Sequence, residues 1–415
     1  MTAGMSQVRK RSGSYAMRRG LLCTVAALGV WAAGTIGAAP EAVAADIRSK
    51  QWYLDAMRAE DIWKSSTGEG IKVAVIDTGV NSSTASLKGQ VLKGLDATES
   101  EGEATDDYTG HGTTMAELIA GTGKGGGLRG LAPGAKVIPM RVATEDFKGT
   151  GVNAWDEAVA IRAAADSDAR IISMSLGTPF LTYREQEAVK YAQSKGKLFF
   201  APVGNSGNKS NKREYPANYD EVVGVAATDR EGQVANYSQH GDFVDIAAPG
   251  NDIPYWCDAT FAKYCVGNGG TSAATALASA TAALIWSEHP DWTANQVLRV
   301  MFESAGRGDD WKPGTVSNYL GHGIVRPNAA INRGIGKPGD PNLSPLTNEK
   351  TGGSAAPSAP ASSQPPKPKP GSNATVAGSS KSTSDGGQLG LIIGIGAAVV
   401  IAVGAFVVVR KRRSA

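Results

Sequence analysis

The chain has 415 residues and a formal net charge of +3 at pH 7, and 41% of its residues are hydrophobic. This length exceeds that of a typical single domain of about 100–200 residues, so it allows a large core with further segments outside it. Several of the basic residues belong to the two terminal segments, which leaves the body of the chain without polybasic character. The composition therefore gives no reason to expect a nucleic-acid partner.

Residues 1–45 have the pattern of a secretory signal peptide. A basic region, an apolar region and an Ala-x-Ala cleavage pattern follow one another, over residues 9–19, 20–39 and 41–46. The alternative is an uncleaved N-terminal anchor, and both interpretations place the body of the protein outside the cytoplasm. Because Asp77 follows so soon, we expect no propeptide here, and residues 47–54 are predicted to be a short extension that lies on the domain.

Residues 46–335 are predicted to form one α/β domain. Apolar runs of strand length alternate with helical patterns, which is typical of a mostly parallel central sheet with helices on both faces. The predicted strands are 73–76, 137–140, 171–176, 198–203, 222–227 and 244–247. The predicted helices are 155–165, 185–194, 272–287 and 294–301. In such sheets ligand-binding groups gather at the carboxyl ends of the strands, where Asp77, Ser175 and Asn205 fall.

Ser272 is a candidate nucleophile because it follows Gly269 and Gly270 and opens a helical pattern rich in small residues. The glycines allow a substrate backbone to approach, and a helix N-terminus stabilises developing negative charge. The alternative is an N-cap, in which Thr271 or Ser272 bonds the free N–H groups of the first helical turn.

Two upstream segments supply the partners that a serine nucleophile needs. Asp77 ends an apolar strand pattern, and His111 opens a helical pattern between two glycines. The order Asp77, His111, Ser272 is the order found in subtilisin and differs from those of chymotrypsin and the α/β-hydrolases. The remaining histidines lie in glycine-bearing loops or before a proline and are predicted to be packing, surface or cap residues: His240, His289 and His322.

With these motifs, and with the segment 201–207 around Asn205, the chain resembles the subtilisin-like serine proteases, or subtilases. The resemblance implies a serine endopeptidase with a subtilisin-like α/β fold. It implies that Ser272 attacks the scissile carbonyl, that His111 moves the proton and that Asp77 orients His111. Asn205 would donate its amide to the oxyanion.

The resemblance also implies where a peptide substrate binds. Subtilases pair the substrate as an added strand with two edge segments, which here are Gly149, Thr150, Gly151 and Ser175, Leu176, Gly177. One position departs from the family pattern, because Ala276 stands where subtilases usually have a proline. A proline is tolerated but not required in a first helical turn, so the departure bears on activity rather than on fold.

Cysteine usage fits an exported chain. Cys23 lies in the predicted signal peptide, which leaves Cys257 and Cys265 as an even pair, and such a pair predicts a disulfide that staples the loop before Ser272. A metal site and two free thiols are the alternatives. We find no metal-binding or cofactor-binding motif and expect no cofactor.

The chain after residue 335 changes in composition. Residues 336–388 are rich in Pro, Ser, Gly and Lys and are predicted to be an extended linker. An apolar run then begins at Leu389 and ends at Val409, which is long enough for a transmembrane helix of about 20 residues. Basic residues in the tail 410–415 predict a cytoplasmic C-terminus and an extracytoplasmic domain on a single-pass cell-membrane protein.

This architecture resembles the mycosins, the membrane-anchored subtilases of actinobacterial type VII secretion systems. The resemblance implies limited proteolysis of exported proteins, with protein or peptide substrates, the lipid bilayer and the secretion membrane complex as partners. A scaffold component of that complex with weak or no proteolytic activity is the alternative, and a broad degradative protease is a third interpretation that tethering disfavours.

Overall fold

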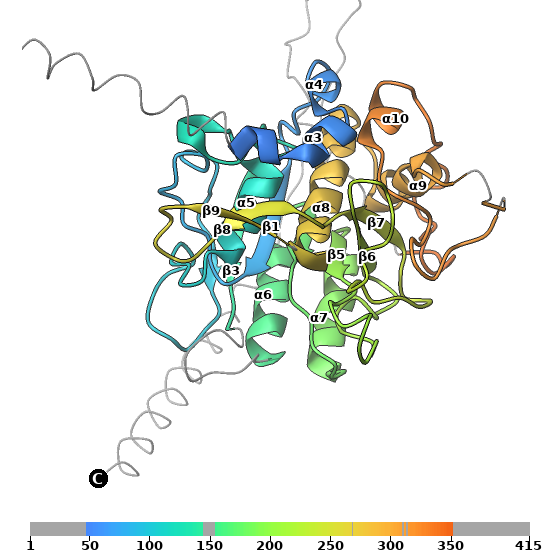
Figure 1. Cartoon of the computed structure of the whole chain (residues 1–415). Coiled ribbons are helices and arrows are strands. Elements are labelled where there is room, and N and C mark those ends of the chain that lie inside the picture. The colour runs from blue at the N-terminus through green and yellow to red at the C-terminus, as the bar shows by residue number, and fades with distance from the viewer. Residues whose placement is uncertain (1–46, 144–153, 268, 309–310, 313, 352–415) are drawn as a thin grey trace, which may run out of the picture. The chain divides into compact units, whose positions relative to one another are not determined.

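Seven strands form the central sheet of the protein (Figure 1). The computed structural model describes residues 47–143, 154–267, 269–308, 311–312 and 314–351. The strand order is β2-β3-β1-β4-β5-β6-β7, and every pairing is parallel. The strands are β1 (Lys72–Asp77), β2 (Leu95–Asp96), β3 (Lys136–Arg141), β4 (Ile171–Met174), β5 (Leu198–Pro202), β6 (Val223–Thr228) and β7 (Ile246–Pro249). The predicted parallel sheet is confirmed, and β2 is a strand that the sequence pattern did not predict.

Helices cover both faces of the sheet because alternate residues of each strand point to opposite sides. Val73 and Val75 of β1 belong to the core under the helices α5 (His111–Ala120) and α8 (Gly270–Glu288). Ala74 and Ile76 belong to the core under α6 (Ala154–Asp166) and α7 (Tyr183–Ser194). Shorter or peripheral helices complete the domain: α3 (Trp52–Ala56), α4 (Ala59–Ile62), η1 (Lys124–Gly126), α9 (Ala294–Ser304) and α10 (Pro327–Ile331).

The long helix α8 carries Ser272 near its start and is the centre of the larger core. Every residue from Gly270 to Trp286 is buried. Its many alanines let it lie close to the strands β4, β5, β6 and β7 and to the helix α5. A helix that is buried all round needs small, apolar residues on every side, and this explains the low polarity of the segment.

An antiparallel hairpin, which the sequence did not predict, precedes α8. It consists of β8 (Ile253–Trp256) and β9 (Tyr264–Gly267), and it lies beside α5 (Figure 1). Cys257 and Cys265 form a disulfide across it, in agreement with the predicted pair. The backbone N–H of Trp256 donates to Thr114 Oγ1 of α5 at 3.0 Å, which ties the hairpin to that helix.

The N-terminal extension lies on the domain, as its sequence predicts. Tyr53 is fully buried, and the Trp52 indole N–H donates to the Asn251 carbonyl at 3.1 Å. The Gln51 side chain donates to the Arg129 carbonyl at 2.8 Å and accepts from the Arg129 N–H at 3.0 Å.

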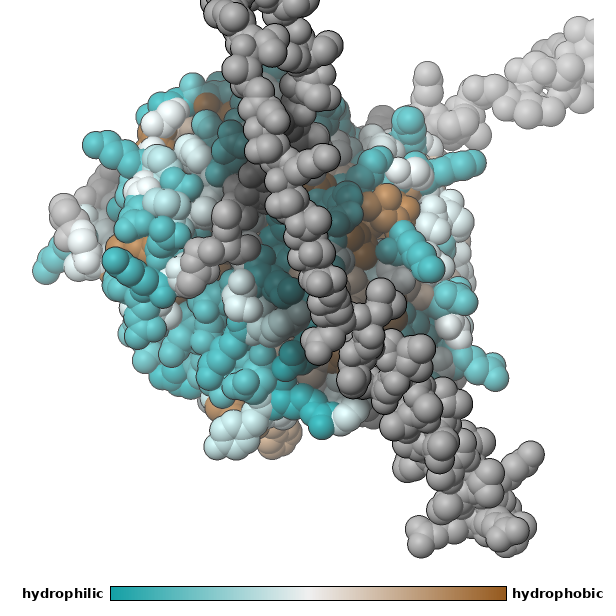
Figure 2. All heavy atoms as spheres, turned by 180° about the vertical axis from the view of Figure 1, so that it is seen from behind, coloured by the Kyte–Doolittle hydropathy of each residue, from teal (hydrophilic) through white to brown (hydrophobic). Residues whose placement is uncertain are grey.

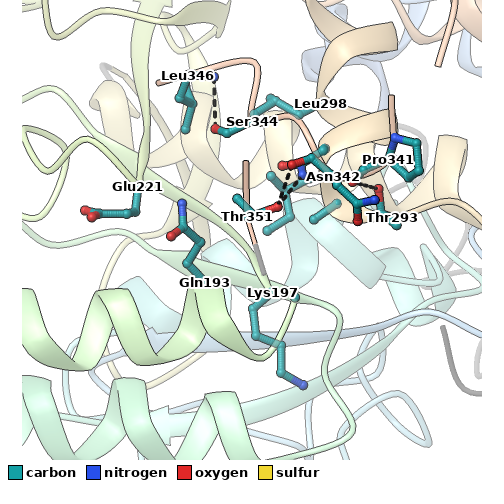
Figure 3. Close-up of a pocket in the computed structure, with 14 residues that line it drawn as sticks. Gln193, Lys197, Glu221, Thr293, Leu298, Pro341, Asn342, Ser344, Leu346 and Thr351 are labelled. Carbon is teal, nitrogen blue, oxygen red and sulfur yellow. Dashed lines mark hydrogen bonds between the residues drawn. The ribbon is translucent and has the colours of Figure 1, made fainter. Parts of the chain in front are cut away.

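The structure differs from the predicted linker boundary, because residues 336–351 pack on the domain. Arg299 of α9 donates to the Leu343 carbonyl at 3.0 Å, Asn295 donates to the Pro341 carbonyl at 3.0 Å, and Ser344 is buried. Together with α9 and the end of α7 these residues enclose a small cavity of about 60 Å³ (Figure 3). Hydrogen bonds from side chains of α9 thus hold residues 336–351 on the domain. The composition of this segment alone had predicted an extended linker.

The face of the domain opposite to the view of Figure 1 is mostly hydrophilic, with small separate hydrophobic patches (Figure 2). Within the described residues, no helix is long and apolar enough to cross a membrane. The predicted signal peptide, the apolar run that begins at Leu389 and the basic tail all lie outside those residues.

Candidate active site

Asp77 and His111 form a hydrogen-bonded pair at the carboxyl end of the sheet. Asp77 is the last residue of β1 and its side chain is fully buried, whereas His111 is the first residue of α5 and its side chain is 37% exposed. Asp77 Oδ1 and His111 Nδ1 are 2.7 Å apart. When Nδ1 donates its proton to the carboxylate, Nε2 is the ring nitrogen that can accept a proton during a reaction.

Glycines make the close approach of β1 and α5 possible. A Cβ on Gly112 would lie 3.0 Å from the Cβ of Asp77 and 2.2 Å from the carbonyl oxygen of Gly79. Gly110, the N-cap of α5, has φ +84°, a conformation that glycine adopts without strain. The two glycines that flank His111 in the sequence are therefore needed for its position beside Asp77.

Asp107 is a residue of the site that the sequence analysis missed. It is 5% exposed and accepts from the backbone N–H groups of Gly110 and Thr113, both at 2.9 Å. It also accepts from the hydroxyl groups of Thr78 at 2.9 Å and Thr113 at 2.6 Å. Asp107 thus joins the end of β1 to the start of α5, and its position four residues before His111 is the one signal that marks it.

A second buried carboxyl lies further along α5. Glu117 accepts from the hydroxyl groups of Thr84 at 2.8 Å and Tyr264 at 2.6 Å. Burial raises the pKa of Glu117 from 4.5 to about 7, and these hydrogen bonds counteract part of that rise. Since Tyr264 belongs to β9, Glu117 is a second link between the disulfide-bonded hairpin and the helix that begins with His111.

Ser272 lies in the first turn of α8 and is 9% exposed. Its hydroxyl donates to the Ser175 carbonyl at 3.1 Å, and the Ser175 hydroxyl donates to the Ser272 carbonyl at 3.2 Å. These two bonds connect the start of α8 to the segment that follows β4. The alternative N-cap role is not seen, because the N-cap of α8 is Gly269 and it has no side-chain cap.

A cavity of about 300 Å³ connects His111 with the start of α8 and with the hairpin. Gly269 and Ala273 line it from the side of α8, and Tyr255, Trp256 and Cys257 line it from the side of β8. The site therefore opens beside the imidazole rather than being sealed by the core.

Asn205 follows β5 and is exposed. Its Oδ1 accepts from the Thr271 N–H at 2.9 Å and from the Thr271 hydroxyl at 3.0 Å. Because the amide oxygen is engaged, the orientation of the amide is set and the NH₂ group is directed away from Thr271. The neighbouring Gly270 has φ +73°, and a Cβ there would lie 3.1 Å from Asn205 Oδ1, so glycine is required for this contact.

Half of the predicted substrate-binding residues can be located. The sequence predicts a strand over residues 171–176, but β4 ends at Met174. The predicted substrate-binding residues after it, Ser175, Leu176 and Gly177, therefore have irregular backbone. Gly149, Thr150 and Gly151 lie outside the described residues.

The other histidines are packed elsewhere, as the sequence predicts. His240 stacks on Tyr319, His289 on Trp292 and His322 on Phe302. Desolvation lowers the pKa of His322 to about 4. Among the described residues, no group of three or more His, Cys, Asp or Glu side chains has the arrangement of a metal site.

A parallel α/β sheet with a buried aspartate, a histidine at a helix start and a serine at the start of a central helix defines the class of serine hydrolases. Residues 68–323 match the family model described as the subtilase family, and the chain belongs to this family of serine endopeptidases.

Comparisons with individual proteins agree. The chain is 33% identical over 278 residues to thermitase of Thermoactinomyces vulgaris, a match that covers 65% of this chain and 95% of thermitase. The crystal structure of MycP1 from Mycobacterium smegmatis is similar with a TM-score of 0.58 and 26% identity, over 68% of this chain and 84% of that one. The structure of the MycP3 protease from the type VII (ESX-3) secretion system has a TM-score of 0.57 and 29% identity, over 68% and 88%. The chain thus resembles the mycosins among the subtilases.

Proposed function

We propose that this subtilase is a membrane-anchored, extracytoplasmic endopeptidase that carries out limited proteolysis of proteins exported by a type VII secretion system. The observation that supports catalysis most directly is the 2.7 Å contact between the buried Asp77 and His111. A buried carboxylate that holds one imidazole nitrogen leaves the other as a proton acceptor at the mouth of the site.

In the proposed mechanism Ser272 attacks the scissile carbonyl carbon, and its proton passes to Nε2 of His111. The hydroxyl must therefore exchange its present bond to the Ser175 carbonyl for one to the imidazole. Asp77 stabilises the imidazolium that forms, and His111 then protonates the leaving amine. Water repeats the sequence on the acyl-enzyme, which releases the carboxylic acid and restores Ser272.

Asn205 is the proposed side-chain donor to the oxyanion. Thr271 engages the amide oxygen, so the NH₂ group is the part of the side chain that can donate to an oxyanion. Loss of one such preorganised donor in a subtilisin lowers turnover by about 10²–10³-fold. The positive end of α8, which begins beside Asn205, favours the same negative charge.

The location and the substrates are proposed from the terminal segments and from the mycosin relatives. The apolar run that ends at Val409 and the basic residues after it support a single-pass membrane anchor with a cytoplasmic C-terminus. Among the proteins of similar structure, MycP1 is an essential component of the type VII (ESX-1) secretion system and MycP3 is a protease from the type VII (ESX-3) secretion system. Exported proteins of such a system are the substrates that we propose.

The test is fluorophosphonate labelling of washed membranes from cells that express the wild-type chain or Ser272→Ala. Loss of the nucleophile in a subtilisin lowers turnover by about 10⁶-fold, so we expect labelling of the wild type alone. A folded wild-type chain that is not labelled would contradict the proposal and favour the scaffold function. Labelled protein in the soluble fraction only would contradict the membrane anchor.

A further inference from the structure

A buried carboxyl group lies where the disulfide-bonded hairpin meets α5. Glu117 stands further along this helix than His111, and it is fully buried. Its Oε2 accepts from the hydroxyl group of Tyr264 of β9 at 2.6 Å, and its Oε1 accepts from the hydroxyl group of Thr84 at 2.8 Å. One carboxyl group thus connects the helix that begins with His111 to two other segments of the chain.

Tyr264 extends this contact to the cavity beside His111. The rings of Tyr264 and Trp256 stack with their centroids 3.8 Å apart, and Trp256 lines the cavity. The indole N–H of Trp256 is buried and has no hydrogen-bond partner among the described residues, but it lowers the pKa of Glu117, so the indole lies close to the carboxyl group. One wall of the cavity is thus held partly through Glu117.

The surroundings of Glu117 favour its neutral form. Burial raises its pKa from 4.5 to about 7, and among the described residues the groups that lower the pKa are hydroxyl and N–H donors without a positive charge. The titratable groups that face it from other elements are Tyr264 of β9 and Tyr53 of α3, and burial raises the pKa of both hydroxyl groups, so both are neutral. The helix α8 packs on α5 with uncharged residues, from Gly270 to Trp286, and the charged residues of β1 and β3 stand at the strand ends. A carboxylate at this position therefore loses its hydration without gaining a cation.

We infer that Glu117 is a positioning residue, which holds the hairpin against α5 while its carboxyl group is protonated and loosens the hairpin when it loses the proton. When the hairpin separates from α5, water reaches the carboxyl group and its pKa returns toward 4.5. The docked hairpin thus keeps the proton to a higher pH than the separated hairpin does, so docking is strongest below pH 4.5 and weakens as the pH rises to about 7. This difference in pKa corresponds to a change of about 300-fold in the docking equilibrium. The inference goes beyond the proposed function, because it makes the cavity of the protease sensitive to pH.

The experiment measures exchange of the Trp256 backbone N–H, which donates to Thr114 of α5 and therefore reports separation of the hairpin. Hydrogen exchange is followed by mass spectrometry on overlapping peptides of the full-length chain in detergent micelles, at about pH 5, 6 and 7 and with correction for the intrinsic pH dependence of exchange. All samples carry Ser272→Ala, and we compare this parent with Glu117→Gln, which keeps the shape but cannot ionise, and with the exposed control Glu231→Gln. The parent and Glu231→Gln should lose about 10-fold in protection for each pH unit, whereas Glu117→Gln should keep its protection.

Peptide cleavage by the active chain, at about pH 6, tests whether the hairpin positions the site. Glu117→Ala leaves the hydroxyl groups of Tyr264 and Thr84 without their acceptor. The loosened wall should raise KM about 10-fold and change kcat little, because His111 keeps its bond to Asp77, and Glu117→Gln should restore KM. An equal KM in all three chains overturns the role. A loss confined to kcat also overturns it, because Glu117 would then act on His111 through α5 rather than through the hairpin.

Exchange of the Trp256 N–H that depends on pH equally in the parent and in Glu117→Gln overturns the inference. This outcome remains decisive if Glu117→Ala does not fold, because Glu117→Gln removes only the ionisation. Fluorophosphonate labelling of the wild type separates the inference from the proposed function. A labelled wild type with either contrary result is a protease without this pH dependence, whereas an unlabelled wild type contradicts the proposed function and leaves the exchange result to stand alone.

Discussion

Two buried carboxyl groups on the neighbouring helices α6 and α7 make the stability of this domain depend on pH. Glu157 and Glu185 are each 1% exposed, and Oε1 of each has no hydrogen-bond partner among the described residues. Burial raises the pKa of Glu157 from 4.5 to about 8, and repulsion from Glu185 and Asp156 adds to the rise. Burial likewise raises the pKa of Glu185 to about 7, which its hydrogen bond with Tyr219 opposes.

We therefore predict that the free energy of unfolding falls as the pH rises. Glu157 keeps its proton to a higher pH in the folded chain than in the unfolded chain, so the unfolded state binds fewer protons between pH 4.5 and about 8. Below pH 4.5 Glu157 does not reduce the free energy of unfolding. As the pH rises from 4.5 to about 8, the free energy of unfolding falls by about 1.4 kcal/mol for each pH unit, which is about 5 kcal/mol in all. Glu157→Gln removes this contribution and should flatten the dependence.

The assay is urea unfolding, monitored by tryptophan fluorescence, at about pH 5, 7 and 9, which span the titration of Glu157. All variants carry Ser272→Ala, which prevents self-cleavage. Glu157→Gln should gain stability relative to its parent at high pH and gain little at pH near 5. Glu231→Gln, on the exposed surface, should follow its parent throughout. Equal pH dependence in Glu157→Gln and in the parent would refute the reasoning.

Three further predictions concern the site. Asn205→Ala should lower kcat by about 10²–10³-fold and change KM little, as measured on a peptide substrate, because its bond forms in the transition state; an equal loss in KM would contradict this role. Asp107→Ala leaves the buried N–H groups of Gly110 and Thr113 without their acceptor, so it should destabilise the domain by about 2–4 kcal/mol in urea unfolding and slow fluorophosphonate labelling; unchanged labelling would show that His111 is held without it. Replacement of both Cys257 and Cys265 by serine opens a short loop closed by the disulfide and should cost about 2–3 kcal/mol of stability; no change in the urea midpoint would contradict that estimate.

The strands of the sheet could be predicted from the sequence because burial on both faces requires a short, continuous apolar run. Each strand pattern is a short apolar run, and β1 shows why, since Val73 and Val75 pack on one helical layer while Ala74 and Ile76 pack on the other. The boundaries were less predictable. The pattern continues through Ser175 and Leu176, but the ladder of β4 ends at Met174, because pairing depends on the neighbouring strand rather than on the apolar run itself.

The hairpin and the segment 336–351 could not be read in the same way. β8 and β9 are short and partly exposed, and their register depends on pairing with each other and on the contact of Trp256 with α5. The segment 336–351 has the composition of a spacer, yet side chains of α9 bind its backbone carbonyls. The hairpin depends on a contact with Thr114, which lies far away in the sequence. The segment 336–351 is bound through its backbone carbonyls, which leave no pattern in the side chains.

The sequence by itself determined the class of fold, the order of Asp77, His111 and Ser272 and the candidate oxyanion donor, because each lies in a short motif with local structural meaning. Only the tertiary structure brought Asp77 and His111 to 2.7 Å, showed the hydrogen bonds of Asp107, and placed Glu214 between two glycines. Gly177, Gly204 and Glu214 belong to no common motif. The loop after β4 and the loop after β5 fold against each other and create this contact, so no local pattern could have revealed it.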